Sequence, residues 1–175
     1  MFTTYGVGEL SAINAIAGSY AESVHVVHLV GSPSRRSMLA RSAARPVHHA
    51  LGDGRMEVYA EMAKHITCAQ AQLHKMSSVG EAAEAYDEVL EQCVLRSKPG
   101  YVSVPYDMME APVPSELLQK ALNVSHLAHD VATEDKIVSR MLKKLQKSRT
   151  PLLIADGLAY PFNLVNEANS LVEAA

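Results

Sequence analysis

The sequence contains only two cysteines, Cys68 and Cys93, among its 175 residues. Small secreted domains rely on several cysteine pairs, so this number excludes a disulfide-rich scaffold. Both cysteines lie in segments with an apolar pattern, and we expect them to be buried free thiols. Such cysteine usage is typical of a reducing compartment and predicts a cytoplasmic protein.

Long apolar runs and blocks of like charge are also missing. The longest apolar stretches, such as "VVHLV" and "PLLIA", are far too short to span a bilayer, so no membrane partner is expected. The start, "MFTTYGVGEL", lacks the basic and apolar regions of a signal peptide. The net charge of −3 comes without a basic block, which argues against nucleic acid as a partner.

What the sequence does contain is an alternation of helical and strand-like patterns. Apolar residues recur at helical spacing in 8–22, 55–65 and 81–96, whereas 24–30, 66–73 and 101–105 are short, strand-like runs. Segment 35–54 is polar and expected to be irregular. The expected inward-facing helical residues are Met56, Tyr59, Ala60 and Met62 or Ala63, and then Ala82, Tyr86, Val89, Cys93 and Val94. This order predicts an α/β fold with a mostly parallel sheet flanked by helices.

A second unit follows a proline-containing stretch at 105–130. A helix capped by Thr133, a buried strand at 151–155 and a last helix at 163–174 are expected there. Ile137, Met141, Leu142 and Leu145 would form the apolar face of the first helix. A strand and an apolar helix face need partners that this unit does not supply. We therefore expect a piece of a larger α/β protein, the alternative being a self-contained domain with a short extension.

Two neighbouring motifs in "RPVHHALGDGRM", residues 45–56, have residues suited to chemistry. His48 and His49 are adjacent, and imidazole exchanges protons near neutral pH. In an extended segment their side chains would point in opposite directions. The sequence 52–54, "GDG", is either a metal-diphosphate loop or a turn. From the residues alone, a structural role for both motifs stays open.

Four stretches, "TTYGVGELSAINAIAGSYAES", "VVHLVGSPS", "HHALGDG" and "GYVSVP", closely resemble the pyruvate decarboxylase family, especially its fungal members. These are thiamine-diphosphate-dependent 2-oxo acid decarboxylases. The resemblance covers essentially the whole chain in one order. It implies that 1–110 form a pyrimidine-binding domain lacking its beginning, that 111–130 form a linker, and that 131–175 begin a Rossmann-like central domain with its first α-β-α elements.

The resemblance further implies decarboxylation of a 2-oxo acid, with pyruvate giving acetaldehyde and carbon dioxide. Thiamine diphosphate and Mg²⁺ are the implied cofactors, although the diphosphate and magnesium ligands are expected outside this chain, which supplies no metal ligand. The implied partners are a small 2-oxo acid and either further copies of the chain or full-length subunits. Because the chain would supply at most half of one site, we expect it to be inactive alone.

The family's functional residues match four positions of this sequence. His48 and His49 match its paired active-site histidines, and His49 is expected to contact the substrate. Tyr101 matches a tyrosine near pyruvate at a proposed activator site, although a core tyrosine is the alternative. Val7 matches a position that packs against the pyrimidine ring of the cofactor.

Two tempting motifs are set aside. Glu9 is not expected to be the family's activating glutamate, which lies upstream of this stretch, and it is interpreted as a helix-start residue. The "GDG" at 52–54 follows no buried strand, and no Asn-Asn pair occurs in the chain, so a turn is expected. His25 and His28 would lie on opposite faces of a strand, which argues against a metal site.

Two other functions remain open. One is a non-catalytic, truncated homologue that associates with intact subunits. The other is a decarboxylase of larger 2-oxo acids such as indolepyruvate, because pocket size cannot be judged from the sequence. The paired histidines favour the decarboxylases over carboligases of the acetolactate synthase type.

Overall fold

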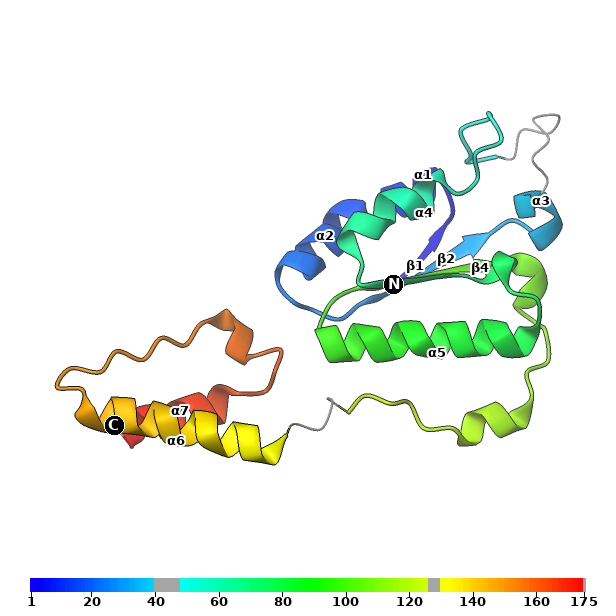
Figure 1. The fold of residues 1–175 in the computed structure, drawn as a ribbon. Helices are drawn as coiled ribbons and strands as arrows, with labels where there is room; N and C mark the ends of the chain where they lie inside the picture. Colours follow the sequence, from blue (N-terminus) through cyan, green and yellow to red (C-terminus); the bar gives the residue numbers. More distant parts are fainter. Residues whose placement is uncertain (40–47, 126–129, 175) are drawn as a thin grey trace. The chain divides into compact units, whose positions relative to one another are not determined.

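The computed structural model describes residues 1–39, 48–125 and 130–174, and Figure 1 shows its ribbon. The chain divides into two compact units, Met1–Val124 and Ser125–Ala175. The first unit contains a sheet with helices, and the described part of the second contains helices without a sheet. The expected site residues all belong to the first unit.

Four parallel strands form the sheet of the first unit: β1 (Phe2–Thr4), β2 (Val27–Ser32), β3 (Ala69–Gln72) and β4 (Gly100–Pro105). Their order across the sheet is β1-β2-β4-β3. Parallel neighbours cannot be joined by a hairpin, and each segment that connects one strand to the next along the chain contains a helix. The expected α/β fold with a parallel sheet is confirmed.

Helices cover both faces of this sheet. The long helix α5 (Val79–Arg96) lies on one face, whereas α1 (Val7–Leu10), α2 (Ile13–Ala21) and α4 (Val58–Ala63) lie on the other (Figure 1). The remaining short elements of the unit are α3 (Arg35–Leu39), η1 (Lys64–Ile66), η2 (Leu73–Lys75), η3 (Tyr106–Met108) and η4 (Ser115–Gln119). The helix α3 is a difference from expectation, because 35–54 was expected to be irregular.

Two apolar cores lie on the two faces of the sheet, and β4 contributes to both. Val102 is fully buried and packs with Val89 of α5 in one core. Tyr101 packs with Val30 and Ala60 in the other core. Successive side chains of a strand point to opposite faces, so neighbouring residues of β4 separate into different cores. This alternation places the Tyr101 side chain on the same face as α1.

The expected long helix at 8–22 is divided into α1 and α2. At the junction the amide of Ala12 donates to the carbonyl of Glu9 at 3.0 Å, which is a three-residue step tighter than α-helical spacing. The apolar pattern is continuous across this point, so periodicity alone did not predict the break. The break leaves α1 as a single short turn directly after β1.

The helical faces are oriented nearly as expected. In α4 Ala63 is buried and Met62 is 45% exposed, which settles the alternative between them. In α5 Ala82, Val89 and Cys93 are buried, but Val94 is 45% exposed because it lies beyond the edge of the apolar stripe. Cys93 and Cys68 are free thiols, with Cys93 buried and Cys68 partly buried.

The second unit contains α6 (Val131–Lys147), η5 (Gly157–Ala159) and α7 (Val165–Glu173). The strand expected at 151–155 is not formed, and Leu152 and Ile154 are 82% and 84% exposed. A strand is stable only when a neighbour accepts and donates its backbone hydrogen bonds, and no described residue of this unit does so. The unit therefore shows the two expected helices without the expected strand.

Helix α6 also differs from expectation in its cap and its burial. Its N-cap is Asp130, whose carboxylate accepts from the amide of Ala132, and Thr133 instead donates its hydroxyl to Asp130. The expected apolar face is not buried, since Ile137 and Met141 are more than half exposed. Among the described residues, no helix is both long and apolar enough to cross a membrane.

Candidate active site

The candidate site lies at the carboxyl end of β1, where the chain turns through Tyr5 and Gly6 into α1. The described residues 48 and 49 lie against this turn. The amide of Val7 donates to the carbonyl of His49 at 3.3 Å, and the hydroxyl of Tyr59 donates to the same oxygen at 3.4 Å. The hydroxyl of Tyr5 donates to the carbonyl of His48. Two elements of the first unit therefore hold the backbone of the histidine pair.

Gly6 makes this close approach of two backbone segments possible. Its φ of +68° is in the left-handed region, which favours glycine. A Cβ at Gly6 would lie 1.9 Å from the carbonyl oxygen of His49, so any side chain here would collide with the histidine segment. The sequence "TTYGVGEL" thus provides a glycine at the one position of the turn where His49 packs.

The rings of His48 and His49 are neighbours. Their centroids are 4.1 Å apart at an interplanar angle of 56°, and the centroid of the Tyr5 ring lies 6.0 Å from that of His49 in a T-shaped arrangement. The expectation that the two side chains point in opposite directions is wrong, because they occupy a turn in which His49 has a φ of +69°. His48 is exposed and His49 is half-buried, so the pair can exchange protons with a molecule bound at the surface.

Val7, the third expected site residue, is the first residue of α1. Its side chain is 53% exposed, although its backbone amide is bonded to His49. An exposed valine held beside two histidines offers a small apolar surface to a flat ring. The structure therefore brings Val7 and the histidine pair together.

Tyr101 lies deeper. Its side chain is 2% exposed, its hydroxyl donates to Glu9 Oε2 at 2.8 Å, and its ring is T-shaped to the His28 ring with the two centroids 5.8 Å apart. Burial is the main cause that raises the pKa of Tyr101, so the hydroxyl keeps its proton and acts as a donor. Tyr101 is thus a buried hydrogen-bond donor to α1, the helix that follows the turn at Gly6 against which the histidine pair lies.

Glu9 is the residue of this region that sequence reasoning undervalued. It lies in the first turn of α1 as expected, but it is only 4% exposed. Burial raises the pKa of Glu9, while hydrogen bonds from Tyr101 and from the backbone of Gly6 act in the opposite direction. Glu9 accepts from the N-cap amide of Gly6 as the third residue of a capping box does, but Gly6 has no side chain for the reciprocal bond, so the local sequence gave only part of that signal. The partner Tyr101 is 92 positions away and gives no local signal.

The "GDG" motif forms a turn, as expected. Gly52 and Gly54 have positive φ values of 79° and 83°, and the Asp53 carboxylate binds the backbone and side chain of Arg55. The Arg55 guanidinium lowers the pKa of Asp53, which is consistent with an ion pair at the surface. In the described part of the chain, no group of three or more His, Cys, Asp or Glu side chains could hold a metal ion.

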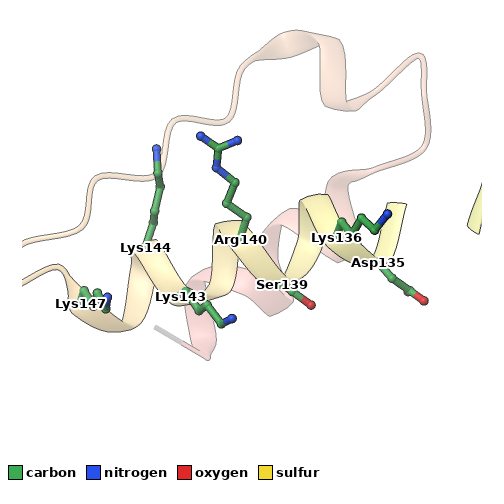
Figure 2. A pocket seen from close by; sticks show the side chains of 7 residues that line it. All are labelled: Asp135, Lys136, Ser139, Arg140, Lys143, Lys144 and Lys147. Carbon is green, nitrogen blue, oxygen red and sulfur yellow. The ribbon is translucent and has the colours of Figure 1, made fainter. Parts of the chain in front are cut away.

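A hollow lies on α6 in the second unit, and its lining is strongly basic. Figure 2 shows that Arg140 and Lys144 extend from one side of the helix, whereas Lys143 and Ser139 extend from the other. Cationic groups that diverge in this way cannot surround a single anion. The hollow therefore does not compete with the histidine pair as a candidate site.

Comparisons with known proteins agree with the sequence motifs. No family model matches the chain. Pyruvate decarboxylases of Aspergillus terreus and Aspergillus fumigatus are each 36% identical to it over 175 residues, which is 100% of this chain and 30% of theirs. Pyruvate decarboxylase isozyme 3 of Saccharomyces cerevisiae is 32% identical over 173 residues, again 30% of its length.

The chain thus spans about 30% of the length of the relatives that it matches. The matched region covers the whole chain and so includes the four stretches that suggested the family. The resemblance is therefore confirmed. Over its whole length, this chain is similar to part of the sequence of pyruvate decarboxylases, as a partial chain of that family would be.

Proposed function

We propose that this chain forms the histidine-bearing part of an active site that decarboxylates a 2-oxo acid, with pyruvate as the substrate. One observation carries the proposal: His48 and His49 are held with ring centroids 4.1 Å apart at the carboxyl end of β1. Ligands of parallel α/β sheets bind at this end of the strands. The similarity to pyruvate decarboxylases gives the reaction class.

The histidines supply the proton transfers of this reaction. Loss of carbon dioxide leaves an electron pair on the carbon that carried the carboxylate, and an imidazolium N–H can protonate that carbon. His49, whose backbone is fixed by Val7 and Tyr59, is the proposed substrate contact. His48, which is more exposed, exchanges its proton with solvent and with its neighbour.

Thiamine diphosphate is the proposed cofactor, and when bound it supplies the electron sink that makes loss of carbon dioxide possible. The exposed Val7 side chain fits a role against one flat ring of this group. The magnesium ligands are proposed to lie outside this chain, and among the described residues no group of three or more His, Cys, Asp or Glu side chains could hold a metal ion. Tyr101 remains a proposed substrate or activator contact, and its hydroxyl is engaged by Glu9.

We also propose the family's domain assignment for this chain. Residues 1–110 would be part of a pyrimidine-binding domain, 111–130 a linker, and 131–175 the first elements of a central domain. The division into two compact units after Val124 supports an arrangement of this kind. The chain spans about 30% of the length of its relatives. We propose that it is a cytoplasmic chain and that, by itself, it does not decarboxylate pyruvate.

The test is to replace the matching segment of the Aspergillus terreus relative by this chain and to measure acetaldehyde formation. The chimera is expected to be active, and His48→Ala or His49→Ala is expected to lower its kcat by about 100-fold or more, which is typical of lost acid–base catalysis. His65→Ala, an exposed histidine on η1, is the matched control and should leave kcat unchanged. Full activity of both histidine variants would overturn the proposal.

Two companion assays separate the remaining functions. Indolepyruvate supplied in place of pyruvate tests for a larger substrate. The isolated chain, given thiamine diphosphate and magnesium, should form no acetaldehyde, and product formation would refute the proposal that it is inactive.

Association with other subunits is the second candidate function, because Leu152 and Ile154 are more than 80% exposed. Co-elution with the Aspergillus terreus relative, or with further copies of the chain, on a size-exclusion column would support it.

A further inference from the structure

Both carboxylate oxygens of Glu9 are used, and each joins a different part of the first unit. Oε1 accepts from the amide of Gly6 at 2.8 Å, and Oε2 accepts from the hydroxyl of Tyr101 at 2.8 Å. Within the described chain, neither bond comes from a cation, although the side chain is 4% exposed. A carboxylate is costly to bury without a cationic partner, so the two bonds must compensate for most of its lost hydration.

Helix capping accounts for only one of these bonds. The bond from the Gly6 amide is one half of a capping box at the start of α1, because Gly6 has no side chain to form the other half, and an exposed glutamate could form it equally well. The bond from Tyr101 reaches α1 from β4, across 92 positions of sequence, and it fixes the carboxylate in the interior. Glu9 therefore connects the central strand to the turn between β1 and α1.

That turn is the platform on which the histidine segment lies. A Cβ at Gly6 would lie 1.9 Å from the carbonyl oxygen of His49, and the amide of Val7 donates to this oxygen. The position of the Gly6 amide, which Glu9 holds, thus sets the position of the next amide and of His49. The contacts form one continuous path from Tyr101 through Glu9 and Gly6 to His49.

We propose that Glu9 is a positioning residue for His49 and that it transmits the position of Tyr101 to the histidine pair. The proposal rests on the proposed function, because His49 is taken to be the substrate contact. Glu9 itself touches neither substrate nor cofactor in this role. A change at Tyr101, such as binding of a ligand nearby, would displace the carboxylate and with it the histidine.

The path can be tested without any catalytic activity. In the chain labelled with ¹³C-histidine, His48→Asn and His49→Asn assign the two ring signals by their loss. Glu9→Ala is expected to shift the His49 signal, because the Gly6 amide loses its acceptor. Glu9→Gln should restore the original position, since its amide oxygen can accept from Gly6 and its nitrogen can donate to Tyr101.

Tyr101→Phe completes a double-mutant cycle. It should shift His49 in the same direction as Glu9→Ala, and the double variant should shift it no further than Glu9→Ala alone. Glu61→Ala and Tyr106→Phe, at exposed positions of α4 and η3, are matched controls that should shift nothing. An unmoved His49 signal in folded Glu9→Ala, or additive shifts in the cycle, would overturn the proposal. If Glu9→Ala unfolds, Tyr101→Phe decides by the same criterion.

The chimera with the Aspergillus terreus relative separates this proposal from the proposed function. There Glu9→Ala is expected to lower kcat by roughly 10- to 100-fold, because a small misplacement of an acid–base group is costly, and Glu9→Gln should recover it. An inactive unsubstituted chimera would refute the proposed function while the ring shifts still decide the role of Glu9. An active chimera with unchanged kcat in Glu9→Ala would refute the positioning role alone.

Discussion

Gly6 and His49 approach each other so closely that a methyl group cannot be placed between them. A Cβ at Gly6 would lie 1.9 Å from the carbonyl oxygen of His49 and 2.8 Å from its carbonyl carbon. Real Cβ atoms keep well beyond such distances, and backbone atoms cannot rotate away as a flexible side chain can. The position of the histidine pair therefore depends on a missing side chain at the end of β1.

Gly6→Ala is accordingly expected to displace the histidine segment and to destabilise the first unit. The positive φ alone costs an alanine about 1–2 kcal/mol, and the collision with His49 adds to this. We expect a loss of at least about 2 kcal/mol in the free energy of unfolding, measured by urea denaturation. The His49 ring signal should shift as well.

Gly52→Ala separates strain from collision. Gly52 also has a positive φ of 79°, but no atom lies within 4 Å of its missing Cβ. It should cost only the backbone strain of about 1 kcal/mol and leave the His49 signal in place. Gly18→Ala, inside α2 with open space around it, should be neutral or stabilising. Equal losses in the two positive-φ variants would contradict the collision.

Val102→Ala tests whether the core under α5 carries the stability of the sheet. Val102 is 0% exposed and packs with Val89. Removal of two methyl groups from a packed core is expected to cost about 2 kcal/mol, from lost burial and the remaining cavity. Val94→Ala, on α5 but 45% exposed and outside the buried stripe, should cost less than about 0.5 kcal/mol. Comparable losses in the free energy of unfolding for the two variants would show that the core around Val102 does not carry the stability of the sheet.

The part of the fold that the sequence predicted well is the part governed by local pattern. Val102 belongs to a short apolar run, and Val89 recurs at helical spacing, so a strand and a helix could be expected at both places. The stretch "PLLIA" has a similar run but forms no strand, because strand formation depends on a neighbour that the local pattern does not reveal. A local apolar pattern therefore predicts a strand or a buried face correctly only where another element is present to pair or pack with it.

The candidate site shows the same division. The adjacency of His48 and His49 can be read from the sequence, and the resemblance to a family suggested a role for them. Their mutual orientation cannot be read from the sequence, because His49 adopts a positive φ that few residues other than glycine adopt. The bond between Glu9 and Tyr101 spans 92 positions and arises only when β1 and β4 pair with opposite edges of β2, as in this sheet. Long-range contacts of this kind could be identified only from the folded structure.

Asp130→Ala should weaken helix α6 more than Thr133→Ala does. The Asp130 carboxylate accepts from the Ala132 amide, whereas Thr133 only donates its hydroxyl to that carboxylate. Loss of an N-cap typically costs about 1 kcal/mol, and the loss of one exposed side-chain hydrogen bond costs less. Amide hydrogen exchange in the first turns of α6 measures both effects. A larger effect of Thr133→Ala would restore threonine as the cap.

His74 should make the first unit less stable as the solution becomes acidic. Its side chain is 2% exposed, and burial is the main cause that lowers the pKa of His74 below its ordinary value of 6.5, with Lys75 acting in the same direction. Glu57, whose Oε1 lies 3.7 Å from His74 Nε2, opposes the shift only in part. Below pH 6.5 the unfolded chain therefore binds a proton at His74 that the folded chain does not bind. The free energy of unfolding falls accordingly as the pH decreases from 6.5 toward the folded pKa.

His74→Gln removes the titrating group, so the loss of stability between roughly pH 7.5 and pH 5.5 should become smaller. It should not vanish, because burial also lowers the pKa of His28, which contributes with the same sign. Urea denaturation at the two pH values gives the slope, and His65→Gln, at an exposed position of η1, should retain the original one. A slope that is unchanged in His74→Gln would mean that His74 is protonated equally in both states, and that its burial excludes no proton.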